Sequence, residues 1–140
     1  MSDASRTFQI ALVEDNPGDV YLIQEALREK GIAYNLELFQ DAEAILSKMK
    51  VAADEPRPDL ILLDLNLPKI EGLDVLRSLR ATPGLDRVPI GILTSSQSPY
   101  DQAKAQAAGA DRYIQKPTSL DEFLTGVGGA IVELLQTPRA

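Results

Sequence analysis

Cysteine and histidine are both absent from this chain of 140 residues. Without cysteine the chain forms no disulfide, zinc–thiolate site or iron–sulfur cluster and carries no thiol nucleophile, which suits a reducing compartment. Without histidine it supplies no imidazole base, imidazole metal ligand or phosphohistidine. Any metal site must therefore be built from oxygen ligands, which favour a hard cation.

Positive charge and long apolar runs are also scarce. Lys and Arg total 14 against 21 Asp and Glu, which gives a formal net charge of -7. A nucleic-acid backbone would be repelled by this charge, so we expect no nucleic-acid partner. The first apolar run, residues 10–13, is too short for a signal-peptide core or a membrane span. We expect a cytoplasmic protein with no membrane association.

The remaining composition is that of an ordinary globular domain. Apolar residues make up 44% of the chain and charged residues 25%, close to the average for folded proteins. A chain of this length fits one domain. We predict a single domain over residues 1–140, with its core over about 8–135 and no output domain.

Five short apolar runs alternate with segments of helical spacing. The runs cover residues 8–13, 34–39, 60–63, 89–93 and 112–114, and the helical segments begin after Asn16, Asp41, Gly72, Ser98 and Ser119. The run 34–39 alternates as an edge strand does, whereas 60–63 is continuously apolar, which is typical of a strand covered on both faces. Five strand–helix pairs predict an α/β fold: a doubly wound, five-stranded parallel sheet with five helices.

Polar residues follow four of these strands. Glu14 and Asp15 follow the first, Asp64 the third, Thr94 the fourth and Lys116 comes just after the fifth. Carboxyl ends of parallel strands share one edge, where such sheets bind ligands. Three neighbouring carboxylates raise one another's pKa, so the arrangement requires a neutralising cation, and oxygen ligands favour Mg²⁺. This predicts phosphoryl transfer to Asp64, with Lys116 and Thr94 contacting phosphoryl oxygens.

The same residues lie in motifs that resemble a known family. The motifs are Glu14–Asp19, Asp64–Pro68 with Gly72, Leu93–Ser95, and Tyr113 with Lys116–Pro117. They resemble the receiver domains of bacterial two-component response regulators, they occur in the family's order, and the resemblance extends over about residues 8–135. It implies a CheY-like (flavodoxin-like) fold with strand order 2-1-3-4-5.

The resemblance also implies a chemical role for each site residue. Asp64 would accept a phosphoryl group from the phosphohistidine of a partner kinase. Glu14, Asp15, Asp64 and the backbone carbonyl of Asn66 would hold Mg²⁺ directly or through water. The protein would then be a phosphoacceptor switch with Mg²⁺-dependent autophosphorylation and autodephosphorylation, not a turnover enzyme.

A switch would follow from the same resemblance. Lys116 would contact the phosphoryl group, and its bond to Pro117 is cis in many receivers. Thr94 would shift to bond a phosphoryl oxygen, and Tyr113 would rotate inward behind it. These movements would change the surface formed by the fourth helix, fifth strand and fifth helix.

The loop motifs Asp15–Asp19, Asp64–Pro68 and Thr94–Ser96 most resemble the single-domain regulators of bacterial and cyanobacterial phytochromes. This subgroup implies a phytochrome-type sensor histidine kinase as the phosphoryl donor. It also implies a homodimer through the fourth helix, fifth strand and fifth helix. The alternatives within the family are a phosphorelay intermediate and a chemotaxis-type receiver that uses another kinase.

Other interpretations of the same residues remain open. A phosphatase of the haloacid-dehalogenase type needs a second aspartate at position 66, where this chain has Asn66. A flavodoxin-type protein needs hydroxyls and amides for the FMN phosphate, where this chain has two carboxylates. A third alternative is a binding module that needs no phosphorylation. By position alone, Tyr113 is equally well a core aromatic residue.

Glycines in the last helical segment are a separate question. Gly126, Gly128 and Gly129 stand inside it, and each costs about 1 kcal/mol relative to alanine in a helix. They either allow close approach to a neighbouring element, which we favour, or make the helix locally weak.

Overall fold

A single parallel sheet organises the chain, and all of its strands run in the same direction. The computed structural model describes residues 6–51, 55–64, 72–95 and 98–136. The strands are β1 (Phe8–Val13), β2 (Tyr34–Phe39), β3 (Leu60–Asp64), β4 (Ile90–Thr94) and β5 (Arg112–Gln115). They pair in the order β2-β1-β3-β4-β5. This confirms the predicted fold class and strand order, and the predicted strand ends are correct to within one residue.

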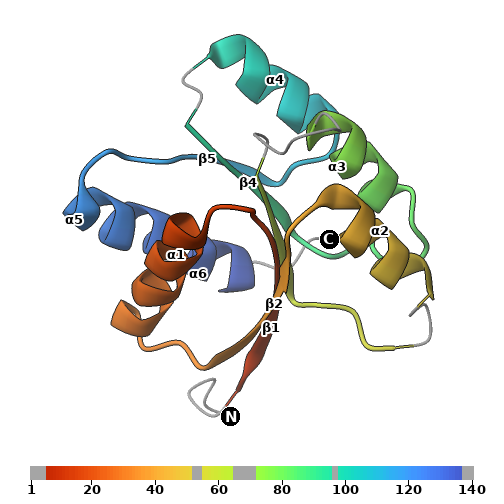
Figure 1. Cartoon of the computed structure of the whole chain (residues 1–140). Coiled ribbons are helices and arrows are strands. Elements are labelled where there is room, and N and C mark those ends of the chain that lie inside the picture. The colour runs from red at the N-terminus through yellow and green to blue at the C-terminus, as the bar shows by residue number, and fades with distance from the viewer. Residues whose placement is uncertain (1–5, 52–54, 65–71, 96–97, 137–140) are drawn as a thin grey trace.

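Helices cover both faces of this sheet (Figure 1). They are α1 (Pro17–Glu29), α2 (Ala42–Val51), α3 (Gly72–Arg80), α4 (Pro99–Ala107), α5 (Leu120–Glu122), the π-helical segment η2 (Phe123–Val127) and α6 (Gly128–Gln136). One core cluster lies between the sheet and α2, α3 and α4, and the other between the sheet and α1, η2 and α6. No helix in the described part of the chain is long and apolar enough to cross a membrane.

Burial along the strands follows their position in the sheet. Every residue of β3 and β4 is buried, as expected for central strands covered by helices on both faces. The edge strand β2 is mostly accessible, and Leu38, which the alternation places with Tyr34 and Leu36, is 41% exposed. The continuous and alternating apolar patterns therefore predicted the central position of β3 and the edge position of β2 correctly. The expectation that Leu38 shares the covered face with Tyr34 and Leu36 is wrong.

Local hydrogen bonds start the helices where the sequence predicts. The Asn16 side chain accepts hydrogen bonds from the backbone N–H groups of Gly18 and Asp19, at 2.8 and 3.2 Å. Asp41, Ser98 and Ser119 accept equivalent bonds at the starts of α2, α4 and α5. Such caps satisfy N–H groups that have no partner within the helix. They fix the point at which each helix leaves the carboxyl edge of the sheet.

The C-terminal helical segment differs from the regular helix that the sequence predicts. Its middle, Phe123–Val127, is π-helical. The sequence Phe-Leu-Thr-Gly-Val combines β-branched residues with glycine, and this low helix propensity accommodates a wider turn. A Cβ on Gly128 would lie 3.2 Å from the carbonyl oxygen of Ala26 on α1, whereas Gly126 and Gly129 face open space. Close approach therefore explains Gly128 alone.

The peptide bond before Pro117 is trans, because the described residues contain no cis peptide bond. The cis bond that the family resemblance suggests is therefore wrong for this structure. The trans isomer is the lower-energy form of an X–Pro bond.

Candidate functional site

Three carboxylates meet at the carboxyl edge of the sheet. Glu14 and Asp15 directly follow β1, and Asp64 ends β3, the strand beside it. Carboxylate oxygens of the three residues lie within 4.8 Å of one another. Glu14 and Asp64 are only 1% and 3% exposed, whereas Asp15 faces solvent. The cluster predicted from the strand ends is therefore present, with Asp15 on its accessible side.

Lys116 brings an ammonium group into this cluster. Its Nζ donates to Asp19 at 2.7 Å, to Glu14 at 3.3 Å and to Asp64 at 3.4 Å. Its backbone N–H donates to the carbonyl of Thr94 at 2.7 Å, which fixes the residue beside the end of β4. Burial lowers the pKa of Lys116, but the hydrogen bond to Asp19 and the surrounding carboxylate charges outweigh it and raise this pKa. Lys116 is thus a permanent positive charge.

One lysine does not neutralise the cluster. Burial of Glu14, reinforced by the hydrogen bond and charge of Asp64, raises the pKa of Glu14 to about 8, although Lys116 acts in the opposite direction. At neutral pH Glu14 therefore holds a proton that a bound cation would displace. Oxygen donors of this kind fit a hard divalent cation such as Mg²⁺.

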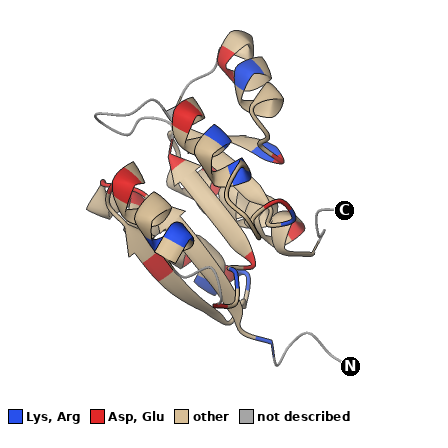
Figure 2. Cartoon of the chain, turned by 90° about the vertical axis from the view of Figure 1, so that its right-hand side faces the viewer, with Lys and Arg blue, Asp and Glu red and all other residues tan. Residues whose placement is uncertain are grey.

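The helices add negative charge to the same edge. The helices α1, α2, α3 and α4 start there, and each carries an acidic residue in its first turn. Figure 2 shows this pattern on α2, α3 and α4, with red near the start of each helix and blue toward its end. The acidic residues in these first turns interact favourably with the helix dipoles, and they attract cations to the site.

The two residues predicted as the switch lie on neighbouring strands. Thr94 ends β4 and is 1% exposed. Tyr113 lies on β5, opposite Ile92 of β4, and packs half-buried against the core cluster under α4. In this structure Tyr113 is thus in part a core residue. Asn66, predicted to offer a backbone carbonyl to the metal, lies outside the described residues.

Asp19 is a site residue that the sequence motifs did not identify. Its place in the first turn of α1 indicates only a favourable interaction with the helix dipole, yet its carboxylate makes the shortest contact to Lys116. The sequence nevertheless indicates where this side chain points. Because Cα–Cβ bonds tilt toward the N-terminus of a helix, a first-turn side chain on a helix that follows β1 directly points back to the carboxyl edge.

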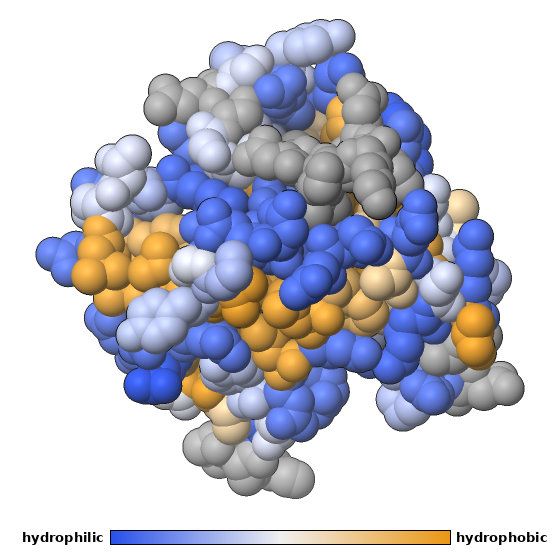
Figure 3. Space-filling model, viewed as in Figure 1, coloured by the Kyte–Doolittle hydropathy of each residue, from blue (hydrophilic) through white to orange (hydrophobic). Residues whose placement is uncertain are grey.

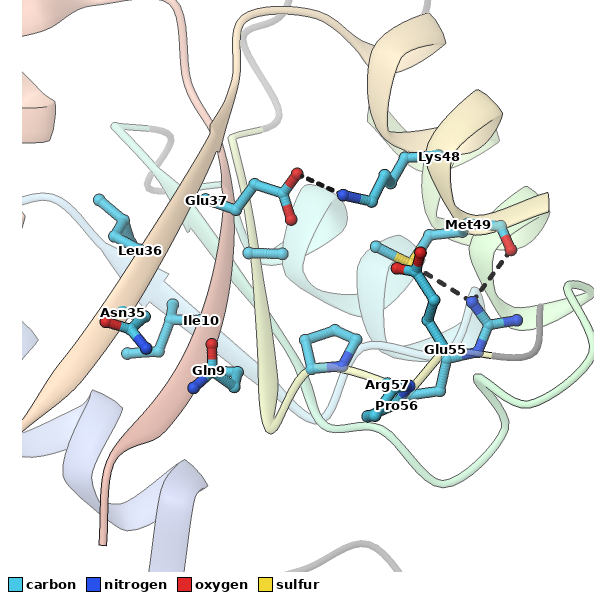
Figure 4. A pocket seen from close by; sticks show the side chains of 12 residues that line it. Gln9, Ile10, Asn35, Leu36, Glu37, Lys48, Met49, Glu55, Pro56 and Arg57 are labelled. Atoms are coloured by element: carbon cyan, nitrogen blue, oxygen red, sulfur yellow. Dashed lines mark hydrogen bonds and ion pairs between the residues drawn. The ribbon is translucent and has the colours of Figure 1, made fainter. Parts of the chain in front are cut away.

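Two hollows lie beside the edge strand β2. A small one of about 210 Å³ adjoins the site and is lined in part by Glu14, Asp15 and Tyr21. A larger one of about 520 Å³ lies toward the amino ends of β1 and β2, under α2 (Figure 4). There Glu37 pairs with Lys48 at 2.8 Å, and none of the three clustered carboxylates lines it. Chemistry, and not cavity size, therefore identifies the functional site.

An acidic cluster with a lysine at the carboxyl edge of a 2-1-3-4-5 sheet is the arrangement of a receiver domain. The chain belongs to the response regulator receiver domain family, whose sequence pattern matches residues 10–127. The predicted family is thereby confirmed.

Among individual proteins, the chain is similar to phytochrome response regulators. It is 37% identical over 133 residues to response regulator Rcp1 of Synechocystis sp., covering 92% of this chain and 90% of that protein. The crystal structure of the phosphorylated cyanobacterial phytochrome response regulator RcpA has a TM-score of 0.82 at 32% identity, covering 96% of this chain and 100% of that one. A Mn²⁺-bound form of Rcp1 has a TM-score of 0.81 at 34% identity, covering 95% and 99%.

Proposed function

We propose that this protein is a response regulator that accepts a phosphoryl group on Asp64 and signals through the resulting change in a protein-binding surface. The observation that carries the proposal is the environment of Asp64. Two further carboxylates lie within 4.8 Å and an ammonium group lies 3.4 Å from it. A nucleophilic carboxylate beside a cation site and a fixed positive charge is the arrangement that phosphoryl transfer to aspartate needs.

The reaction forms one bond and breaks another. A carboxylate oxygen of Asp64 attacks phosphorus, the bond from phosphorus to the donor nitrogen of a phosphohistidine breaks, and the imidazole leaves. Lys116 then pairs with a phosphoryl oxygen of the new acyl phosphate. Hydrolysis later returns Asp64 and inorganic phosphate, so the protein works as a phosphoacceptor switch and not as a turnover enzyme.

A divalent cation, Mg²⁺ in our proposal, would be held by Glu14, Asp15 and Asp64, with the backbone carbonyl of Asn66 as a further ligand. When bound, it would neutralise the negative charge that gathers as the phosphoryl group approaches three carboxylates. The fit rests on the oxygen-only donor set and on the raised pKa of Glu14. The Mn²⁺-bound form of the related Rcp1 supports it.

The switch would use Thr94 and Tyr113. The Thr94 hydroxyl, at the end of the strand next to Asp64, would donate to a phosphoryl oxygen. Tyr113, now half-buried beside Ile92 on the neighbouring strand, would move further inward. Together they would transmit the local charge change to the surface of α4, β5 and α5.

The proposed phosphoryl donor is a phytochrome-type sensor histidine kinase. This proposal is supported by similarity over nearly the whole chain to RcpA, a cyanobacterial phytochrome response regulator. The chain contains no histidine, so the phosphohistidine of such a relay must belong to a partner.

Phosphoryl acceptance is tested by intact mass after incubation with acetyl phosphate and Mg²⁺. We expect the wild type to gain one phosphoryl group, the gain to require Mg²⁺, and Asp64→Asn to show none. Glu37→Gln removes an exposed acidic residue that pairs with Lys48 away from the carboxylate cluster; it is the control and should behave as the wild type. A gain that persists in Asp64→Asn would reject Asp64 as the acceptor.

A further inference from the structure

The position of Lys116 depends on a carboxylate that lies outside the metal cluster. We propose that Asp19 is a positioning residue that gives the Lys116 ammonium its shortest ion pair outside the metal cluster in the unphosphorylated protein. It thereby favours cation binding and opposes the phosphorylated state. The inference rests on the proposed phosphoryl acceptance by Asp64. It adds a residue that sets the balance between the unphosphorylated, cation-bound protein and the phosphorylated protein.

The distances support this role. Lys116 Nζ lies 2.7 Å from Asp19, against 3.3 Å from Glu14 and 3.4 Å from Asp64. The shortest and strongest pairing is therefore made to a carboxylate that is absent from the three-residue cluster. Lys116 is 11% exposed and Asp19 is 24% exposed, so water screens this pair less than a surface pair.

Asp19 is also held rigidly. Pro17 occupies the first turn of α1, and the N–H of Asp19 donates to the capping side chain of Asn16 at 3.2 Å. Proline fixes its own φ angle and the cap fixes the backbone around it. The backbone that carries the Asp19 carboxylate is thus fixed beside Lys116.

Cation binding follows from this geometry. A cation that binds Glu14 and Asp64 competes with Lys116 for their oxygens. With Asp19 present, Lys116 keeps its shortest ion pair while it gives up its contacts with Glu14 and Asp64. Without the Asp19 charge, the partners of Lys116 in the described part of the chain are Glu14 and Asp64, so the cation must displace it from both.

The phosphorylated state responds in the opposite direction. A phosphoryl group on Asp64 is an additional acceptor for the Lys116 ammonium, and Asp19 competes with it for the same protons. Removal of the Asp19 charge therefore strengthens the interaction between Lys116 and a phosphoryl oxygen. Opposite effects on cation and phosphoryl binding are the signature of this role, because loss of folded structure would weaken both.

The experiment compares Asp19→Asn with the wild type by calorimetric titration of Mg²⁺ and then of beryllofluoride, a phosphoryl mimic, at saturating Mg²⁺. We expect about threefold to tenfold weaker Mg²⁺ binding and about threefold to tenfold tighter beryllofluoride binding, the range of a partly buried ion pair. The matched control is Glu25→Gln. Glu25 lies on the same helix, is 26% exposed, and pairs with Arg28 at 3.3 Å. Its substitution removes the same charge and should change neither affinity.

Two further variants separate positioning from a general effect of charge. Asp19→Glu keeps the carboxylate and should restore affinities close to those of the wild type. In a Lys116→Met background, Asp19→Asn should change Mg²⁺ affinity by less than twofold, since the lysine on which Asp19 acts is absent.

Three results would overturn the inference: unchanged affinities in Asp19→Asn, changes of the same sign for both ligands, or an undiminished effect on Mg²⁺ binding in the Lys116→Met background. The proposed function fails separately. If wild-type protein takes up no phosphoryl group from acetyl phosphate, Asp64 is not an acceptor. If it does take one up and the Asp19 variants match the wild type, only the role of Asp19 is rejected.

Discussion

Burial and the neighbouring Asp64 act on Glu14 in the same direction, and together they raise its pKa to about 8 from an ordinary 4.5. Between pH 4.5 and about pH 8, Glu14 therefore keeps its proton in the folded protein without metal, whereas the unfolded chain has released it. The stability of the folded protein declines as pH rises across that interval, because the deprotonated form is the less favourable one when folded. A bound divalent cation reverses this penalty by pairing with the carboxylate.

We predict that Mg²⁺ binding at pH 7 releases nearly one proton and that release disappears above about pH 9, where Glu14 is already ionised. Calorimetric titration in two buffers of different ionisation enthalpy measures the number of protons released. The same titration of Glu14→Gln should show no release and weaker binding. Equal release in the wild type and in Glu14→Gln would assign the proton to another group.

At the scale of elements, the contact between α1 and α6 depends on a glycine. A Cβ on Gly128 would lie 3.2 Å from the backbone oxygen of Ala26, which cannot move without shifting α1. Its neighbour Gly129 has no atom within 4 Å of the same position. The two adjacent glycines therefore differ in packing although both are helical.

We predict opposite effects of alanine at these positions. Gly128→Ala should lower the free energy of unfolding by about 1–3 kcal/mol through overpacking. Gly129→Ala should raise it by about 0.5–1 kcal/mol, because alanine has the higher helix propensity and meets no neighbour. Urea unfolding followed by circular dichroism measures both. Equal changes in the two variants would show that α1 accommodates the added methyl group.

Arg80 ties several elements together at the end of α3. Its guanidinium donates to the carbonyls of Gly109 and Val88 at 2.9 and 2.6 Å and to the carboxylate of Asp111 at 2.5 Å. Asp111 in turn accepts from the N–H of Ile90 at 2.8 Å. The side chain of Arg80 is only 12% exposed, so its removal takes several hydrogen bonds from partly buried acceptors.

We predict that Arg80→Ala lowers the free energy of unfolding by about 2–4 kcal/mol. Arg77→Ala on the same helix is the control, because Arg77 is 56% exposed and forms a surface pair with Asp74. That variant should change stability by less than about 0.5 kcal/mol. Thermal and urea unfolding of the two variants test the difference, and similar losses would contradict a special role for Arg80.

How far the sequence predicts these elements depends on the range of the interactions. Helix caps such as Asn16 and Ser119 depend on neighbouring residues only, and a continuous apolar run such as that of β3 indicates a buried strand. These features were therefore predictable from the sequence. The contact of Gly128 with Ala26 and the ion pair of Asp19 with Lys116, 97 residues apart, depend on how helices pack onto the sheet. The π-helical turn is similar, since weak helix propensity permits it but does not require it.

At the scale of the whole molecule, the surface formed by α4, β5 and α5 is suited to contact a second copy. Among the described strands β5 pairs only with β4, so its outer edge is open. Tyr100 on α4 and Leu120 on α5 are 68% and 58% exposed. Figure 3 shows apolar side chains reaching the surface beside α5 and beside β2, with hydrophilic side chains between them. The phosphoryl switch that we propose ends at this surface.

We predict that the protein forms a homodimer through α4, β5 and α5, and that beryllofluoride with Mg²⁺ strengthens it. Tyr100→Asp places a charge on the exposed part of α4 and should shift the protein toward monomer, because a desolvated unpaired charge is costly in an interface. Val51→Asp on α2, where Val51 is 87% exposed, is the control and should leave assembly unchanged. Sedimentation equilibrium at micromolar concentration gives the mass. A wild-type monomer with and without beryllofluoride would reject the dimer, while equal weakening by both variants would locate its interface elsewhere.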